Sequence, residues 1–422
     1  MESSKEILAT SEVVVIGGGV IGLSCAYELV RKGVDVTVLD KGRPGEGAAW
    51  GSAGWVTQML SAPLPAPGLV GKSLKWMLQK DSPLYIKPWA DSGLPKWLWD
   101  FWRHCNRRDH ETGLEAMAAL TEHTMTLYDE LAKDGIEFEM EKAGLLFAFT
   151  SEEGLQHTLD ELRAMERYGY SSPPVLDGDS VRDAEPALTK AVVGGMLVES
   201  ERHVRPELLT AGLSRRLAES GANLRSGTEV TGVKRQGSRM TCVVTTGGEV
   251  PGDRFLIASG AWSASLARMA GFHLPVQCGK GYSVTVTEPA VRLRRPLYLG
   301  EAKLGVTPFR NALRIAGTME LAGISEALDP RRLEAIRASA DQFLVGWRQG
   351  KSEEEWAGMR PVTPDGLPAI GRAPGYDNLY VATGHAMLGV TLAPATGVAM
   401  AELIHSGNAD VDLRPFDPNR FS

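Results

Sequence analysis

The first residues that could do chemistry are three glycines, Gly17, Gly19 and Gly22, in the run GGGVIG at 17–22. The first glycine of such a spacing permits a tight turn, the second lets backbone approach a pyrophosphate, and the third lets a helix pack closely. A carboxylate at Asp40 could accept hydrogen bonds from an adenosine ribose. The pattern predicts a dinucleotide-binding turn, the alternative being a plain glycine-rich turn. The residues assigned to it are Gly17, Gly19, Val20, Ile21, Gly22, Asp40 and Lys41.

A second group of candidates lies near the carboxyl terminus. Arg360 stands in the run GMRPV at 358–362, and a planar guanidinium suits bidentate recognition of a carboxylate. The alternative is a structural arginine. A strand predicted at 379–382 leads into a glycine-rich turn with His385 and then a helix, whose N-terminus could face the pyrimidine edge of a flavin. The binding positions expected here are Gly384, His385, Leu388, Gly389, Val390 and Thr391.

A third group of candidates lies within the run FLIASGAWS at 255–263. It reads as a buried strand that enters a turn of small residues, which lets backbone lie close to a flat cofactor. An ordinary strand end is the alternative. From this part of the chain we assign Ser259, Gly260 and Trp262 to the cofactor, together with Val230 on a preceding strand.

These residues need elements to position them. The β-branched run at 13–16 predicts a strand buried on both faces, 20–30 has a helical period, and 36–39 predicts a second strand, which completes a βαβ unit. The segment 62–108, rich in Pro, Trp and Lys, is predicted to leave the sheet as an insertion. Further helices are expected at 114–131, 155–168, 206–218, 331–343 and 391–404, with short strands near 230, 243 and 255.

Composition narrows the function classes. A chain of 422 residues predicts two or three domains, and 43% hydrophobic with 23% charged residues is typical of a globular protein. A net charge of -7 argues against nucleic-acid binding, which depends on cations that neutralise phosphate. The four cysteines show no metal-ligand spacing, so we expect no metal site and free thiols in a reducing compartment. No apolar run predicts a signal or a membrane span.

Taken in order, these segments resemble the D-amino-acid oxidase superfamily of FAD-dependent oxidoreductases, and within it the bacterial D-amino-acid dehydrogenases. The resemblance covers nearly the whole chain and includes LKWML at 74–78, KGYS at 280–283 and RIAGTME at 314–320. It implies an α/β fold with a discontinuous, Rossmann-like FAD-binding domain and a second α+β substrate domain that contains a mixed β-sheet. The implied FAD-binding domain covers 1–60, 195–275 and 356–422, and the substrate domain covers 61–194 and 276–355. In relatives the arginine at the position of Arg360 holds the substrate carboxylate.

The chain also departs from its relatives. Where they often have an Asn-Ala-Gly turn near the flavin, this chain has Ser52, Ala53 and Gly54, and a serine replaces only part of the hydrogen bonding of an asparagine. Glycine oxidases use a tyrosine at the position of Gly305, so we expect a different pocket, which Tyr282 could reach unless it is a packed tyrosine. Sarcosine oxidases tether FAD through a cysteine near the position of Leu304. Because no cysteine follows Cys278, we expect non-covalent FAD.

The resemblance implies oxidation of a D-amino acid by hydride transfer to flavin N5, which gives an imino acid and then a 2-oxo acid and ammonia. Arg360 would orient the substrate, and Tyr282 is a further catalytic candidate. His385 is expected to bind the cofactor rather than to act as a general base. Three alternatives stay open: a hydroxy-D-proline dehydrogenase, an oxygen-using amino-acid or secondary-amine oxidase, and a non-catalytic flavin-binding redox subunit.

A dehydrogenase must pass its electrons to an acceptor such as a quinone or an electron-transfer chain. The Trp- and Lys-rich stretch at 72–108 is the candidate for peripheral contact with a membrane, since these residue types suit the headgroup level. The alternative places these tryptophans in the core of a helical insertion. We therefore expect a cytoplasmic protein, with any membrane contact on the inner face.

Overall fold

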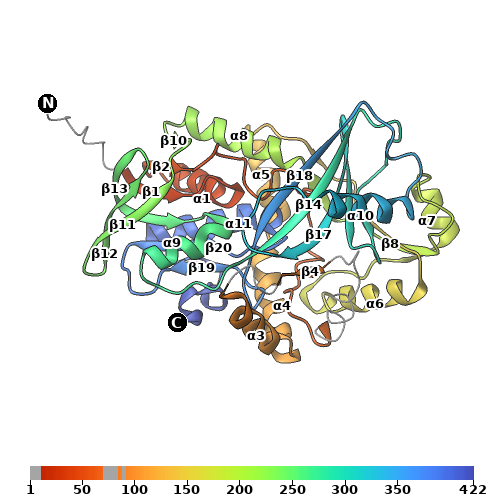
Figure 1. Ribbon diagram of the computed structural model, residues 1–422, viewed down its shortest axis with the longest axis horizontal. Coiled ribbons are helices and arrows are strands. Elements are labelled where there is room, and N and C mark those ends of the chain that lie inside the picture. The colour runs from red at the N-terminus through yellow and green to blue at the C-terminus, as the bar shows by residue number, and fades with distance from the viewer. Residues whose placement is uncertain (1–10, 70–83, 88–91) are drawn as a thin grey trace.

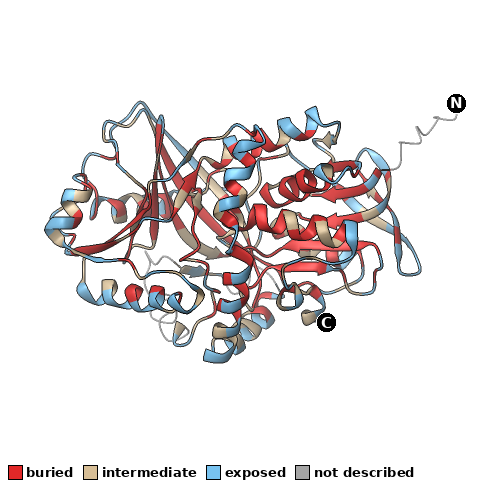
Figure 2. Cartoon of the chain, turned by 180° about the vertical axis from the view of Figure 1, so that it is seen from behind, coloured by how far each residue is buried: buried red, intermediate tan, exposed pale blue. Residues whose placement is uncertain are grey.

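The computed structural model describes residues 11–69, 84–87 and 92–422. Two large sheets organise these residues, and they occupy opposite halves of the elongated molecule in Figure 1. In Figure 2 the buried residues gather along the strands of both sheets, while the outer helices and loops carry most exposed residues.

The first sheet has eight strands, in the order β10-β2-β1-β13-β12-β11, with β20 beside β13 and β19 beside β20. β1, β2, β10, β13 and β20 pair in parallel, as the predicted βαβ unit requires. Its strands are β1 (Ser11–Ile16), β2 (Val36–Leu39), β10 (Asn223–Arg225), β11 (Val230–Gln236), β12 (Arg239–Thr245), β13 (Gly248–Ile257), β19 (Ala369–Arg372) and β20 (Leu379–Thr383).

The run VVVI in β1 is buried because both faces of the sheet are covered. Val13 and Val15 pack in one core with α1 (Val20–Arg31), α8 (Pro206–Glu219) and α11 (Gly389–Ser406). Val14 and Ile16 pack in a second core with β11, β12 and α9 (Ser263–Met269). This placement brings the start of α1, the end of β13 and the start of α11 to the same edge of the sheet.

The second sheet has nine strands, in the order β18-β14-β17-β16-β15-β6-β8-β7, with β4 beside β17. It is mixed, because β15 pairs with β6 and β4 with β17 in parallel while the other pairs are antiparallel. Its strands are β4 (Leu84–Ile86), β6 (Leu145–Phe149), β7 (Val175–Asp177), β8 (Gly194–Val198), β14 (Gln277–Thr287), β15 (Leu297–Leu299), β16 (Leu304–Phe309), β17 (Ala312–Leu321) and β18 (Ser352–Val362).

The remaining elements cover the second sheet and join the two halves. A small sheet of β3 (Trp55–Val56), β9 (Arg202–Val204) and β5 (Met140–Glu141) contacts both halves, because Trp55 bonds to Thr307 on β16 and to Thr391 on α11. The other helices are α3 (Leu94–His104), α4 (Arg107–Thr121), α5 (Thr124–Lys133), α6 (Glu152–Arg163), α7 (Gly178–Ala184) and α10 (Pro330–Asp341). Along the described ranges, no helix is long and apolar enough to cross a membrane.

Two sequence predictions need correction. The helix predicted at 114–131 is two helices, α4 and α5, and the Gln58 side chain donates to the Thr121 and Glu122 carbonyls where they separate. The helix predicted at 155–168 ends at Arg163, followed by a 3-10 turn. The segment 62–108 contributes no described strand to the first sheet, as predicted, and its strand β4 pairs with the end of β17 in the second sheet.

The division into domains stays a prediction. The eight strands of the first sheet come from the ranges assigned to the FAD-binding domain. Two predicted boundaries, at 194/195 and 355/356, fall inside β8 and β18 of the second sheet.

Candidate active site

A cavity of about 740 Å³ lies where the two halves meet. It is bounded by the turn after β1, the end of β13, strand β18 and the start of α11. Most of the residues predicted for cofactor and substrate line it, although they come from distant parts of the chain. These lining residues are Gly17, Gly19, Val20, Ile21, Asp40, Lys41, Ser52, Val230, Ser259, Gly260, Trp262, Arg360, His385, Gly389 and Val390.

The glycine-rich turn has the geometry that a dinucleotide needs. Gly17 has a φ of +108°, and a Cβ there would lie 2.6 Å from the Ala258 carbonyl oxygen. A Cβ at Gly22 would lie 1.9 Å from the Gly17 carbonyl oxygen, so only glycine lets α1 start so close to β1. No side chain caps α1, and its first turn contains no acidic residue. The N–H groups of this helix end are therefore open to an anion.

Asp40 is fixed by backbone donors. Its Oδ2 accepts from the Gly18 N–H at 2.7 Å and its Oδ1 from the Gly42 N–H at 2.7 Å. A carboxylate has about four acceptor sites, so acceptor capacity remains for ribose hydroxyls. Nearby, the Lys41 ammonium lies 3.7 Å from the ring centroid of Trp262.

Arg360 brings a positive charge into the cavity without an anionic partner. Its Nη1 donates to the Thr318 carbonyl at 2.8 Å, and no carboxylate within the described ranges forms an ion pair with it. Burial lowers the pKa of Arg360 to about 10, so the side chain stays protonated at neutral pH. A Cβ at Gly281 would lie 1.8 Å from Nη1, so the guanidinium uses the space that this glycine leaves.

His385 contributes a buried imidazole. Its Nε2 lies 3.1 Å from the Thr396 Oγ1, whereas its Nδ1 is buried without a hydrogen-bond partner among the residues described. Burial lowers the pKa of His385 to about 3, so the ring is neutral and a weak base at physiological pH. An orphaned nitrogen inside a cavity favours a hydrogen bond to a bound group over proton transfer.

The start of α11 is a second open helix end. Leu388 precedes it without a side-chain cap, the first turn has no acidic residue, and Gly389 and Val390 line the cavity. Thr391 instead anchors β3, because its Oγ1 accepts from the Thr57 N–H and donates to the Trp55 carbonyl.

Several predicted residues do not line the cavity, namely Gly22, Ala53, Gly54, Tyr282, Gly384, Leu388 and Thr391. The clearest difference is Tyr282, whose side chain is 1% exposed in the core beneath α10. Its hydroxyl donates to the Glu320 carboxylate at 2.8 Å. The alternative of a packed tyrosine with a satisfied hydroxyl therefore describes this residue.

Sequence reasoning missed other lining residues. They are concentrated in the loop 42–49 and on β18, where Trp356 packs across Gly51 and Gly358. A Cβ at either glycine would come within 2.5 Å of the indole ring. Two glycines so far apart in sequence gave no joint signal, because only the fold brings them to the same ring.

Gly305 leaves room for the Trp55 indole ring against β16, and neither residue lines the cavity. A Cβ at Gly305 would lie 2.8 Å from Cζ2 of Trp55, whose indole covers this part of β16. The Trp55 Nε1 donates to the Thr307 Oγ1 at 2.9 Å, which fixes the ring. A larger side chain at 305 would displace Trp55.

The arrangement fits a flavin dinucleotide. A backbone cradle with an open helix end suits a pyrophosphate, a fixed carboxylate suits a ribose, and a second open helix end with an unpartnered imidazole nitrogen suits an electron-rich ring. In the described ranges, no cluster of His, Cys, Asp and Glu could hold a metal ion.

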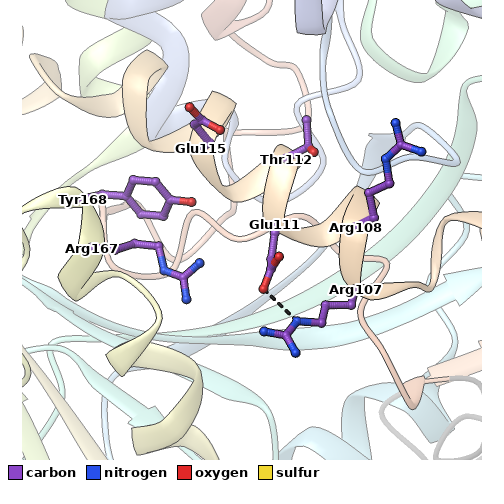
Figure 3. Close-up of a pocket in the computed structure, with 7 residues that line it drawn as sticks. All are labelled: Arg107, Arg108, Glu111, Thr112, Glu115, Arg167 and Tyr168. Carbon is purple, nitrogen blue, oxygen red and sulfur yellow. Dashed lines mark hydrogen bonds and ion pairs between the residues drawn. The ribbon is translucent and has the colours of Figure 1, made fainter.

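A second hollow lies on the surface and shares no lining residue with the cavity. Figure 3 shows its side chains, which come from α4 and the turn after α6, and the ion pair of 2.9 Å between Arg107 and Glu111. Its lining residues are Arg107, Arg108, Glu111, Thr112, Glu115, Arg167 and Tyr168.

Comparisons with known proteins agree with this geometry. A model of the family described as FAD dependent oxidoreductase matches residues 12–403. A D-amino acid dehydrogenase of Methylobacterium sp. (strain 4-46) is 34% identical over 419 residues, which cover 97% of this chain and 99% of the relative.

Solved structures are similar along nearly the whole chain. Glycine oxidase from Geobacillus kaustophilus has a TM-score of 0.79 at 25% identity, covering 98% of this chain and 99% of its own. L-proline dehydrogenase from P. horikoshii has a TM-score of 0.77 at 21% identity, covering 98% of each chain. The predicted fold class is confirmed.

Proposed function

Because the chain belongs to the family of FAD-dependent oxidoreductases, we propose that it binds FAD non-covalently and oxidises a small D-amino acid. The observation that carries the substrate class is Arg360, a protonated guanidinium in the cavity with no carboxylate partner within the described ranges. A partly buried cation without a counter-ion is unfavourable, so the site gains most from a ligand that brings a carboxylate.

Arg360 is also placed to orient such a ligand. The Thr318 carbonyl takes one of its N–H groups and leaves the others free for a carboxylate. Thr318 has a φ of +61°, a strained conformation for a threonine, which turns its carbonyl toward the guanidinium. Two fixed points, a carboxylate on Arg360 and the pocket wall, would determine which face of the α-carbon meets the cofactor.

When bound, FAD supplies a hydride acceptor at N5, so the expected products are an imino acid and, after hydrolysis, a 2-oxo acid and ammonia. The residues that would hold it are the glycine-rich turn, Asp40, the turn after β13 and the start of α11. His385, neutral at physiological pH, would offer its free Nδ1 as a hydrogen-bonding group.

The D-configuration is proposed from the relatives that carry the name D-amino acid dehydrogenase. Structures similar in fold include an L-proline dehydrogenase, so the fold alone leaves the stereochemistry open. Incubation with matched D- and L-amino acids, an artificial electron acceptor and no oxygen should give a 2-oxo acid and ammonia from D-enantiomers. Products from L-enantiomers alone would contradict the proposal, and peroxide formed in air would favour an oxidase.

Non-covalent binding is proposed because no cysteine lines the cavity and none follows Cys278 in the sequence. Acid precipitation of the purified protein should leave all of the flavin in the supernatant. Flavin that stays with the precipitated chain would contradict it.

We further propose that the electrons pass to a quinone or an electron-transfer chain at a membrane, from a cytoplasmic protein. On α3, Trp99 and Trp102 are 58% and 49% exposed, with ring centroids 4.7 Å apart, whereas Trp97 is buried. Residues 72–83 and 88–91 of the predicted contact, which include LKWML at 74–78, lie outside the described residues. The free cysteines are compatible with a reducing compartment.

Flotation with anionic vesicles at low salt tests the membrane contact. The wild type should float with the vesicles, and Trp99→Ala with Trp102→Ala should weaken flotation. Val345→Ala, which removes an equally exposed apolar side chain elsewhere, serves as the control. Failure of the wild type to bind vesicles would contradict the proposal.

A further inference from the structure

Arg314 on β17 is a buried cation outside the cavity that contacts three separate segments. Its side chain is 5% exposed. Its Nε donates to the Thr285 Oγ1 on β14 at 2.9 Å, which fixes the plane of the guanidinium. Its Nη1 and Nη2 donate to the Glu207 carboxylate on α8 at 3.2 and 2.9 Å. It therefore ties the second sheet to a helix of the first half.

The ion pair with Glu207 is well supported. The Arg205 Nε donates to the same carboxylate at 2.8 Å. Burial alone would raise the pKa of Glu207, but the hydrogen bonds and charges of Arg314 and Arg205 hold it below its usual range. The carboxylate is thus ionised at neutral pH, and the buried guanidinium has a permanent counter-ion.

The third contact is the loop 49–53, which lies beside the cavity. Nη1 of Arg314 donates to the Trp50 carbonyl at 3.3 Å and to the Ser52 carbonyl at 3.1 Å. The N–H of Ser52 bonds within the loop, to the Ala49 carbonyl, and both Ala49 and Ser52 line the cavity. The Ala49 carbonyl is thus satisfied within the loop, whereas the Trp50 and Ser52 carbonyls accept from a side chain of the second sheet.

Thr307 on β16 completes this attachment. Its Oγ1 donates to the Ala53 carbonyl at 2.7 Å. Three carbonyls in the loop are therefore held by two side chains of neighbouring strands. Arg314 holds two of them and is the only one of the two side chains that carries a charge.

We propose that Arg314 is a positioning residue that holds the loop 49–53 against the cofactor, and so couples the substrate sheet to FAD. The inference rests on the proposed function in that FAD occupies the cavity. A lysine cannot replace it, because one ammonium cannot reach a carboxylate, two loop carbonyls and the Thr285 hydroxyl from a single point. Release of the loop would loosen the cavity wall at Ser52 without altering Arg360.

The test is the rate at which purified holoenzyme releases FAD on dilution, followed by flavin fluorescence. Arg314→Met and Arg314→Lys should release FAD at least about tenfold faster than the wild type. Their flavin absorbance band should also change shape, because the polarity of the cavity wall changes.

Arg420→Met is the matched control. Arg420 is a partly buried arginine that binds the Asp365 carboxylate and the Leu367 and Pro368 carbonyls, and it does not line the cavity. This variant should lower the melting temperature but release FAD within about twofold of the wild-type rate.

Equal FAD release by Arg314→Met and Arg420→Met, with unchanged flavin spectra, would overturn the proposal. If Arg314→Met does not fold, Arg314→Lys decides by the same comparison, because it keeps the charge beside Glu207. FAD release involves no amino acid. Failure of every amino acid to reduce the wild-type flavin would therefore contradict the proposed substrate and leave the role of Arg314 to be judged by release alone.

Discussion

At the Asp40 end of the cavity, backbone groups already fix the polar side chain, whereas at the Arg360 end a partly buried guanidinium lacks a carboxylate partner and a buried imidazole nitrogen lacks a hydrogen-bond partner among the residues described. Asp40 accepts two backbone N–H groups. Within the described part of the chain, Arg360 binds one carbonyl and no carboxylate, and the His385 Nδ1 has no partner. The first end is preformed for a cofactor, and the second gains hydrogen bonds only when a ligand arrives.

The largest effect is expected from a substitution in the glycine-rich turn, at the preformed end of the cavity. Gly17→Ala should yield protein without flavin, because the added Cβ would lie 2.6 Å from the Ala258 carbonyl oxygen and the backbone has a φ of +108°. The measurement is the ratio of flavin to protein absorbance after purification.

Gly33→Ala is the control for this change. Gly33 also has a positive φ, +80°, but a Cβ there would meet nothing within 4 Å. This variant should lose about 1 kcal/mol of stability and keep its flavin. Full flavin content in Gly17→Ala would show that the turn does not hold the cofactor.

The next largest effect is expected when the cation at the Arg360 end of the cavity is removed. Arg360→Met should lower kcat/KM for amino-acid oxidation by about 10²–10³-fold, mainly through KM, because a buried carboxylate would lose its charge partner. Steady-state kinetics with an artificial acceptor measures it. Arg202→Met, which breaks an ion pair with Asp129 away from the cavity, should leave KM unchanged. An unchanged KM in Arg360→Met would exclude the carboxylate role.

Two buried histidines, one lining the cavity and one outside it, should make the stability of the protein depend on pH. Burial lowers the pKa of His385 to about 3 and of His203 to about 4, below the ordinary value of 6.5. The unfolded chain therefore takes up protons first. Above about pH 6.5 the two histidines are neutral in both states and leave the free energy of unfolding independent of pH. Below that pH the free energy of unfolding falls toward pH 4, by at most about 1.4 kcal/mol per pH unit for each residue.

His385→Gln and His203→Gln should both flatten this slope in urea unfolding, compared with the wild type at pH 7 and pH 5. The variants are compared with one another because Glu201 has the opposite effect. Burial raises the pKa of Glu201 to about 7, so this residue lowers the free energy of unfolding as the pH rises from 5 to 7. Only His385→Gln should also release FAD faster, since His203 does not line the cavity. Equal FAD release by both would contradict a cofactor contact at His385.

The smallest expected effect is at Asp40. Asp40→Asn keeps one acceptor oxygen for the backbone but loses the charge, so FAD should bind about tenfold more weakly. Titration of the flavin-free protein with FAD measures this. Asp177→Asn, which alters an exposed acceptor of the Ser180 N–H, is the control. Unchanged FAD affinity in Asp40→Asn would remove the carboxylate from the cofactor site.

The same contrast between the two ends explains what the sequence could predict. The turn at Gly17, the helix after it and Asp40 fall within one βαβ unit, so spacing alone located them, and β2 begins and ends where predicted. Arg360 was assigned its role through the family resemblance. The face on which a β14 side chain points depends on register, which is why Tyr282 turned out to be a core residue.

Long-range partners left no readable signal. The attachment of the loop 49–53 to Arg314, and the packing of Trp356 across Gly51, join residues that only the fold brings together. Pairing of β4 with β17 was missed for the same reason, because three residues in a Pro- and Trp-rich segment do not show a strand period.

The most direct test of the central claim is an anaerobic absorbance titration of the purified protein with D- and L-amino acids, glycine, sarcosine and hydroxyproline isomers. We predict a flavin band that D-enantiomers bleach and that stays oxidised with their L-counterparts. A missing flavin band would contradict FAD binding, and a band that no amine bleaches would contradict the proposed substrate class.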